Sequence, residues 1–290
     1  MSARSAPAAG LLRASIAVSS TLILALACVL AMVFVLTPIV WAIATSLKTE
    51  VGAVSYPPSF VPRPMTLANY WRVFTGQNFL VELSNSVLYS VCAVALAIAV
   101  AAPAGYAAAR FSFPGKGAVM MVILAASMIP TVALLIPIYG LLGRIGLLNS
   151  AVALIVIEAA RTAPQTVWFI QNFCQTVSRE IDEAAEIDGA SRMQIFGYVI
   201  LPLIRPGIAA VAILGLITVW NDYLTVAIFA PDAAKRTPQV AIVNQVLDSN
   251  GISWSYMMAF VVVASAPVVL MFLLAQTWFV AGLTSGGVKG

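Results

Sequence analysis

Six apolar runs constrain this sequence more than any other feature. They cover about residues 18–46, 84–109, 118–142, 150–173, 207–230 and 257–282, and a helix needs about 20 apolar residues to cross a bilayer. Since lipid cannot hydrogen-bond to an exposed backbone, such segments must be helices. Only 9% of the residues are charged, whereas a soluble domain carries about 25%. The predicted fold is therefore all-α: a polytopic membrane protein whose single transmembrane domain, residues 1–290, has six transmembrane helices.

The basic residues between the spans favour one orientation. Six spans place both termini on the same side of the membrane. The eight basic residues on that side are Arg4, Arg13, Arg110, Lys116, Arg179, Arg192, Arg205 and Lys289. The six on the opposite side are Lys48, Arg63, Arg72, Arg144, Lys235 and Arg236. Because Lys and Arg accumulate in cytoplasmic loops, this small excess places both termini and the loop 174–206 in the cytoplasm.

Residues that could support catalysis or metal binding are scarce. The chain has no histidine, which excludes histidine-based acid–base or metal chemistry. Gly115-Lys116 lacks the upstream glycine and the following Ser or Thr of the phosphate-binding pattern GxxxxGK[ST]. Cys28, Cys92 and Cys174 lie in or at the end of apolar runs, where cysteine acts as a small hydrophobic residue. We therefore predict no enzymatic activity and no metal site, and no basic cluster indicates nucleic acid.

The loop 174–206 is polar and has the pattern of two short helices. Ser178 is a plausible N-cap, Gly189 suits a left-handed position after the first helix, and Ser191 with Gln194 forms a capping box before the second. Four residues of the first helix share one flat face, namely Ile181, Ala184, Ala185 and Asp188. Such a helix suits insertion into a partner's cleft, but an amphipathic helix at the membrane surface would show the same pattern.

Two predicted spans contain ionisable residues. The fourth has Glu158 and Arg161 on one helix face, and the fifth has Asn221 and Asp222 beside Trp220. A buried charge costs about 2.5–3.5 kcal/mol on insertion scales, so these side chains should face protein or water. At 1.5 Å per residue, Glu158 lies about 12 Å from the outer end of its span and Asn221 about 21 Å from the inner end. This common depth allows a shared polar cavity, while an ion pair that neutralises itself remains the alternative.

Three motifs resemble one family of transporters. In the loop, the matching residues are Glu183-Ala184-Ala185, Asp188-Gly189-Ala190, Phe196, Leu201-Pro202 and Pro206. They resemble the EAA loop of ABC importer permeases. Trp220-Asn221-Asp222 resembles a signature in the fifth span of sugar-importer permeases. The segment Val280 to Gly290 is similar to the C-terminal end of the second permease of the maltose-type pair.

The resemblance implies a type I ABC importer fold in which the loop forms a cytoplasmic coupling helix. The residues it implies for contact with the ATPase are Glu183, Ala184, Ala185, Asp188 and Gly189. The residues expected along the substrate pathway are Glu158, Arg161, Trp220, Asn221 and Asp222. The implied partners are a second homologous permease, two ATP-hydrolysing subunits that bind ATP and Mg²⁺, and an extracytoplasmic substrate-binding protein. The resemblance also supports a bacterial inner membrane location with cytoplasmic termini.

Two alternatives remain at this point. An ion-coupled secondary carrier would use Glu158 or Asp222 as its proton site, although the sequence shows none of the inverted repeats that such carriers often contain. An ABC importer for another solute, such as a glycerophosphodiester, would resemble a sugar importer at this level. The preferred interpretation is the permease subunit of a carbohydrate importer.

Overall fold

The computed structural model describes residues 6–76, 78–247, 251 and 253–287. In this part of the chain all regular structure is helical, which confirms the all-α prediction. The chain forms two compact units, one of Met1–Val73 with Ser253–Val262 and the other of Phe74–Ile252 with Val263–Gly290. The predicted C-terminal motif is only partly covered, because residues 288–290 lie outside the described residues.

The first unit is formed by α1 (Ala6–Ser46), α2 (Glu50–Ala53), most of α3 (Ala68–Thr75) and the start of α14 (Trp254–Gly287). Hydrogen bonds join these elements where their ends meet. Asn69 donates to the carbonyl oxygens of Ser46 and Lys48, both at 2.8 Å. The carboxylate of Glu50 accepts bonds from Ser253 Oγ, Ser255 Oγ and the Trp254 N–H at 2.6–2.9 Å. Glu50 therefore caps the beginning of α14 from another element.

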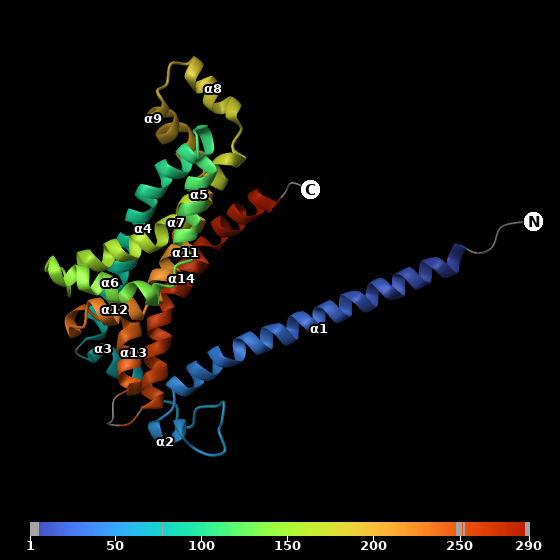
Figure 1. Ribbon diagram of the computed structural model, residues 1–290. Helices are drawn as coiled ribbons and strands as arrows, with labels where there is room; N and C mark the ends of the chain where they lie inside the picture. The colour runs from blue at the N-terminus through green and yellow to red at the C-terminus, as the bar shows by residue number, and fades with distance from the viewer. Residues whose placement is uncertain (1–5, 77, 248–250, 252, 288–290) are drawn as a thin grey trace, which may run out of the picture. The chain divides into compact units, whose positions relative to one another are not determined.

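The second unit is organised around α4 (Phe79–Arg110), which packs along α7 (Ala151–Thr176) and against α11 (Arg205–Trp220). Small residues allow these helices to approach closely. At Gly105 an added Cβ would lie 2.9 Å from the backbone nitrogen of Gln171 and 2.9 Å from Ile170 Cγ2. At Gly215, on α11, it would lie 3.0 Å from Val94. Figure 1 shows α4 and α7 lying together in this unit.

The predicted third span is two helices. The chain forms α5 (Lys116–Ala126) and α6 (Thr131–Arg144), which meet at 87°. Pro130 precedes α6 and restricts Ile129 to an extended conformation, so the helical path that leaves α5 does not continue into α6. The predicted fifth span is interrupted as well: α11 ends at Trp220 and α12 (Leu224–Phe229) begins after residues 221–223.

Three helical stretches in the described part are long and apolar enough to cross a membrane: Thr21–Ser46, Phe79–Arg110 and Trp254–Leu273. Two bent pairs pass the same test together, namely α5 with α6, and Arg192–Leu203 with α11, which meet at 75°. α7 is not among them, because Glu158, Arg161 and Gln165 lower its hydropathy. Several apolar helices are thus present, while the number of six crossings stays a prediction.

Candidate functional site

The loop between α7 and α11 folds as its sequence pattern predicts. It contains α8 (Arg179–Ile187), α9 (Arg192–Gln194), the π-helical segment η1 (Ile195–Ile200) and α10 (Leu201–Leu203). The hydroxyl of Ser178 accepts a bond from the Glu180 N–H at 3.3 Å. Ser191 and Gln194 form the predicted capping box. α8 and α9 lie together at one end of the second unit (Figure 1).

The end of α8 is closed by the glycine that the sequence singled out. Gly189 has φ of +84°, in the left-handed region that favours glycine. Its N–H bonds to Glu186 O, and the Ala190 N–H bonds to Ala185 O, both at 3.0 Å. These two bonds are those of a Schellman motif. Open space surrounds the position at which Gly189 would carry a Cβ.

One face of α8 is exposed. Ile181, Glu183, Ala184, Ile187 and Asp188 all lie on the surface. Ala185, which the sequence placed on the same face as Ile181 and Ala184, is half-buried and packs against the hydrophobic cluster below the loop. The predicted docking surface therefore has Ala185 at its inner edge, and the other four predicted coupling residues are freely accessible.

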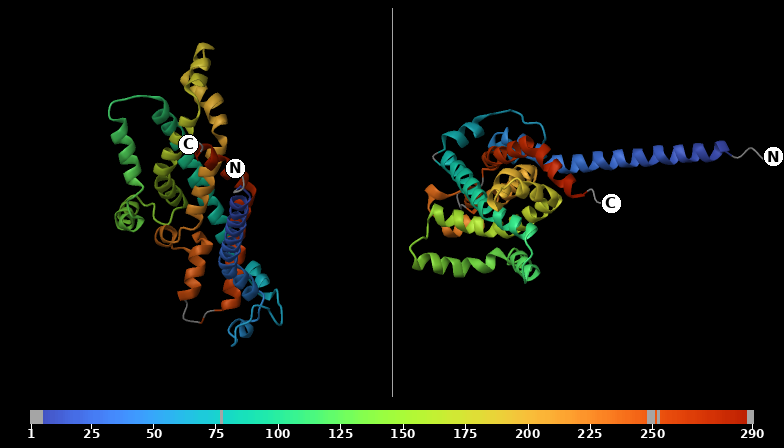
Figure 2. Two further views of the ribbon diagram at one scale, coloured as in Figure 1. Left: turned by 90° about the vertical axis from the view of Figure 1, so that its right-hand side faces the viewer. Right: turned by 90° about the horizontal axis from the view of Figure 1, so that it is seen from above.

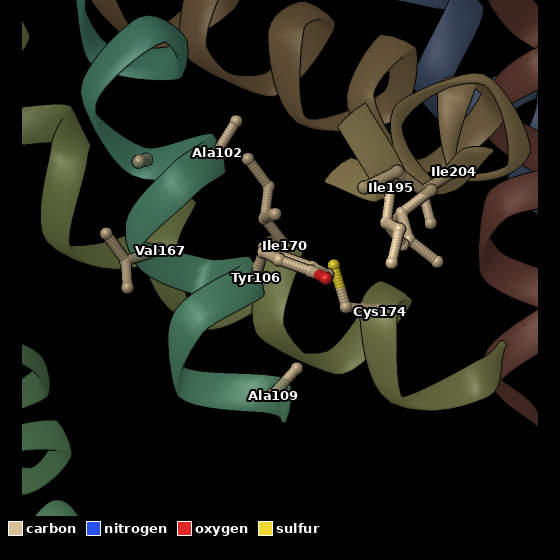
Figure 3. Close-up of a cluster of buried hydrophobic side chains, with 10 residues drawn as sticks. Ala102, Tyr106, Ala109, Val167, Ile170, Cys174, Ile195 and Ile204 are labelled. Atoms are coloured by element: carbon tan, nitrogen blue, oxygen red, sulfur yellow. The ribbon is translucent and has the colours of Figure 1, made fainter. Parts of the chain in front are cut away.

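The cluster below the loop, called here the end cluster, joins α4, α7 and the loop. Its buried members are Ala101, Ala102, Tyr106, Ala109, Val167, Ile170, Cys174, Ile195, Ile200 and Ile204. Figure 3 shows side chains of α4, α7 and the loop helices converging there. Because all three are packed in one cluster, the loop is attached to the ends of two long helices and not only to the chain on either side of it.

The acidic residue of α8 that matters for this attachment is Asp182, which sequence reasoning did not assign to the site. It is the buried residue of α8 and lies 2.8 Å from Arg110 Nη2, with 5% of either side chain exposed. Tyr106 donates a hydrogen bond to Asp182 Oδ1 at 3.3 Å. Arg110 and Asp182 are 72 positions apart, so no local pattern could have paired them.

The ionisable residues of the predicted substrate pathway also come together. Arg161 Nη2 lies 2.5 Å from Glu158 Oε2 and 3.2 Å from Asp222 Oδ2. Only 1% of the Glu158 side chain is exposed, compared with 27% of Arg161 and 10% of Asp222. Asp222 reaches Arg161 because α11 ends at Trp220 and the Asp222 carboxylate caps the next turn, accepting bonds from the Thr225 N–H and Oγ1 at 2.8 and 3.0 Å.

The other two residues of that prediction lie apart from this charge cluster. Asn221 is exposed, and its amide donates to Ile217 O, in its own helix, at 2.8 Å. Trp220 is buried. Depth arguments thus anticipated the meeting of the fourth and fifth spans, and the structure joins them through Arg161 and Asp222.

A cavity of about 730 Å³ lies within the second unit, beside Arg161. Its walls come from the end of α5 and from α6, α7, α11 and α12, and Figure 2 shows α5 and α6 standing to one side of the other helices. Most lining residues are apolar, and the polar ones include Arg161, Gln165 and Thr218. Of the five residues predicted for the substrate pathway, all in the described part of the chain, Arg161 alone lines this cavity.

Similarity to known proteins agrees with this geometry. Residues 101–285 match the family described as binding-protein-dependent transport system inner membrane component. The sulfoquinovosyl glycerol transport system permease protein SmoH of Agrobacterium fabrum is 33% identical over 88% of this chain and 89% of its own length. The trehalose/maltose transport system permease protein MalG of Thermococcus litoralis is 30% identical over 93% and 97%.

The fold has a counterpart among solved structures. A chain of a bacterial ABC transporter that imports the acidic polysaccharide alginate superposes with a TM-score of 0.79, covering 96% of this chain and all of that one at 21% identity. This likeness concerns the fold, and it confirms the type I importer architecture expected from the loop. With the family match over residues 101–285, it leads to one conclusion: the chain is a membrane-embedded permease of the binding-protein-dependent transport system inner membrane component family.

Proposed function

We propose that this chain is the permease subunit of an ATP-driven importer that translocates a carbohydrate delivered by an extracytoplasmic binding protein. The names of its relatives support the substrate class, because one concerns sulfoquinovosyl glycerol and another trehalose and maltose. These compounds differ in charge and size but all contain sugars. The relatives therefore support a carbohydrate as the class of substrate.

In this proposal the chain performs no catalysis. It pairs with a second, homologous permease and with two ATP-hydrolysing subunits, which bind ATP and Mg²⁺. The importer lies in the bacterial inner membrane with the termini and α8 in the cytoplasm. Closure of the ATPases displaces α8, and the spans then expose the transport path to alternate sides of the membrane.

The observation that carries the proposal is the state of α8. A nine-residue helix is fastened on one side by Asp182 and Ala185, while Glu183, Ala184 and Asp188 stand free on the other. The free face of this helix also carries a large apolar side chain between its acidic residues. Ile187 is 87% exposed, and an exposed apolar side chain of this size suits a helix that inserts into a partner.

Docking is tested by Ala184→Trp, which adds a large side chain to the exposed face without disturbing the packing of the chain. We expect the ATPase subunits to be lost during purification and ATP-driven uptake into proteoliposomes to disappear. Met193→Trp is the matched control, because Met193 is also exposed and lies in the same loop outside the predicted docking residues. Normal assembly and uptake by Ala184→Trp would contradict the docking role. Uptake by the wild type that needs a proton gradient but no ATP would instead indicate the ion-coupled carrier.

Orientation is tested with single cysteines in a background that lacks Cys28, Cys92 and Cys174. A cysteine at exposed Ser191 should react only with reagent added from the cytoplasm. A cysteine at Asp248, which lies outside the described residues, should react only from the external side. The reverse pattern would invert the topology and with it the transport direction proposed here.

A further inference from the structure

The ion pair between Arg110 and Asp182 joins two elements that the chain itself connects only through α5, α6 and α7. Arg110 is the last residue of α4, and Asp182 lies in the first turn of α8. Both side chains are 5% exposed, and the charged atoms are 2.8 Å apart. Each charge also has the sign that its helix end favours, positive at a C-terminus and negative at an N-terminus.

Three further contacts surround this pair. Arg110 Nη2 donates to the carbonyl oxygen of Val177, in the linker just before α8, at 3.1 Å. Arg179 Nη2 reaches back to Ala109 O in α4 at 3.4 Å. Tyr106, one turn above Arg110, donates to Asp182 Oδ1 at 3.3 Å. The end of α4 therefore holds both the helix α8 and the linker that leads into it.

The direction of these side chains determines which contacts connect the exposed face of α8 to α4. Asp182 points towards α4, whereas Glu183 and Ala184, the next two residues, are exposed. A partner that pushes on the exposed face of α8 therefore has a direct polar connection to α4 through Asp182 and Arg110, beside the apolar contacts of Ala185 in the end cluster. α4 in turn packs along α7 and α11, the helices that line the cavity beside Arg161.

We propose that the Arg110–Asp182 pair is the joint that transmits displacement of α8 to α4, so that Arg110, Asp182 and Tyr106 are positioning residues for energy coupling. This inference rests on the proposed function, because it takes an ATPase as the partner that moves α8. It differs from docking: the joint lies on the opposite side of α8 and touches the rest of this chain. Loss of the joint should leave the ATPase bound but disconnect its cycle from transport.

The first test is Asp182→Asn in the complete importer reconstituted in proteoliposomes, with uptake and ATP hydrolysis measured together. We expect the ATPase subunits to remain bound and hydrolysis to continue, while substrate imported per ATP falls about tenfold. Glu186→Gln is the matched control. It removes a carboxylate from the same helix, but that carboxylate pairs with Arg192 near the surface. The amount of substrate imported per ATP should therefore stay unchanged.

The second test asks whether the connection itself matters, or whether the pair only keeps each buried charge neutralised. Arg110→Cys with Asp182→Cys, in a background lacking the native cysteines, removes both charges at once. We expect low coupling until a short bifunctional thiol reagent links the two positions, and recovery once it does. Normal coupling in the double-cysteine variant without the reagent would overturn the proposed joint. An unchanged ratio of uptake to hydrolysis in Asp182→Asn would overturn it as well. Absence of ATP-dependent uptake in the wild type would instead refute the proposed function.

Discussion

The two buried charge clusters of the second unit differ in their balance. At the end of α4 the guanidinium of Arg110 contacts one carboxylate, whereas in the middle of α7 the guanidinium of Arg161 contacts two carboxylates. Arg110 and Asp182 balance each other and are equally buried. Arg161 is shared by Glu158, which is almost fully buried, and Asp222, which is partly exposed. A balanced pair has one stable arrangement, so it suits a fixed attachment. A cluster with a surplus carboxylate can lose one partner and still neutralise its arginine, so it tolerates rearrangement.

The largest effect should come from Arg161→Gln, which strands two carboxylates at once. Breaking a buried pair by removing one partner costs about 3–5 kcal/mol, so we expect Arg161→Gln to destabilise the protein at least as much as Arg110→Gln. Thermal unfolding of the two purified variants in the same detergent measures the difference. Equal or higher stability of Arg161→Gln would mean that water already screens the three-charge cluster.

Glu158→Gln should destabilise the protein far less than Arg161→Gln, although it also removes a buried charge. The variant leaves Arg161 paired with Asp222 and thereby converts the cluster into a balanced pair. We expect a loss of stability under about 1 kcal/mol, against about 3–5 kcal/mol for Asp182→Asn, which strands Arg110. If transport nevertheless falls in Glu158→Gln while assembly is normal, Glu158 acts in the substrate pathway. Normal transport would indicate that Glu158 only neutralises Arg161.

The third prediction concerns the helix contact that lies between the two clusters. Gly105→Ala places a Cβ 2.9 Å from Ile170 Cγ2 and from the Gln171 nitrogen, so α4 must shift away from α7. Overpacking of this kind costs about 1–3 kcal/mol, and we expect weaker coupling together with a lower unfolding temperature. Gly140→Ala in α6 is the control, because open space surrounds that position; it should be neutral or stabilising. A neutral Gly105→Ala would show that α4 and α7 separate easily.

The smallest effect is expected at Glu50, a carboxylate stabilised by neutral donors in place of a cation. Burial alone would raise its pKa, but the bonds from Ser253, Ser255 and the α14 backbone lower the pKa of Glu50 below its ordinary value. A lowered pKa adds stability above the unfolded-state pKa, and this stability is lost as pH falls through the folded-state value. Glu50→Gln should therefore lower the unfolding temperature slightly at pH 7 and have no effect in strong acid. A difference that persists in acid would point to packing.

The sequence predicted the loop far better than the spans. Its caps depend on residues within a few positions of each other, so Ser178, Gly189 and the Ser191–Gln194 box could be identified directly. The break at residues 127–130 could not, because proline gives no unique signal in this chain. Pro103, Pro137 and Pro164 lie inside continuous helices, whereas Pro130 precedes a new one.

The two charge clusters show the same difference between local and distant signals. Glu158, Arg161 and Asp222 were identified because ionisable residues are expensive in apolar spans, and this local signal is strong. Arg110 and Asp182 appeared only as a loop charge and a first-turn acid, since both lie near predicted span ends where charges are common. Their pairing depends on how α4 and α8 pack, and no spacing in the sequence contains that information.

The interruption after Trp220 has a consequence for hydration. α11 has 16 residues, about 24 Å at 1.5 Å per residue, while the hydrocarbon layer is about 30 Å thick. With the predicted span 207–230, residues 221–223 lie at membrane depth, and a helix end exposes carbonyl and N–H groups that the next turn would normally bind. Acyl chains offer these groups nothing to bind, so the membrane here must be replaced by protein or by water molecules. The same interruption that lets Asp222 reach Arg161 thus requires a wet or protein-lined region beside it, which a transporter of hydroxyl-rich molecules can use.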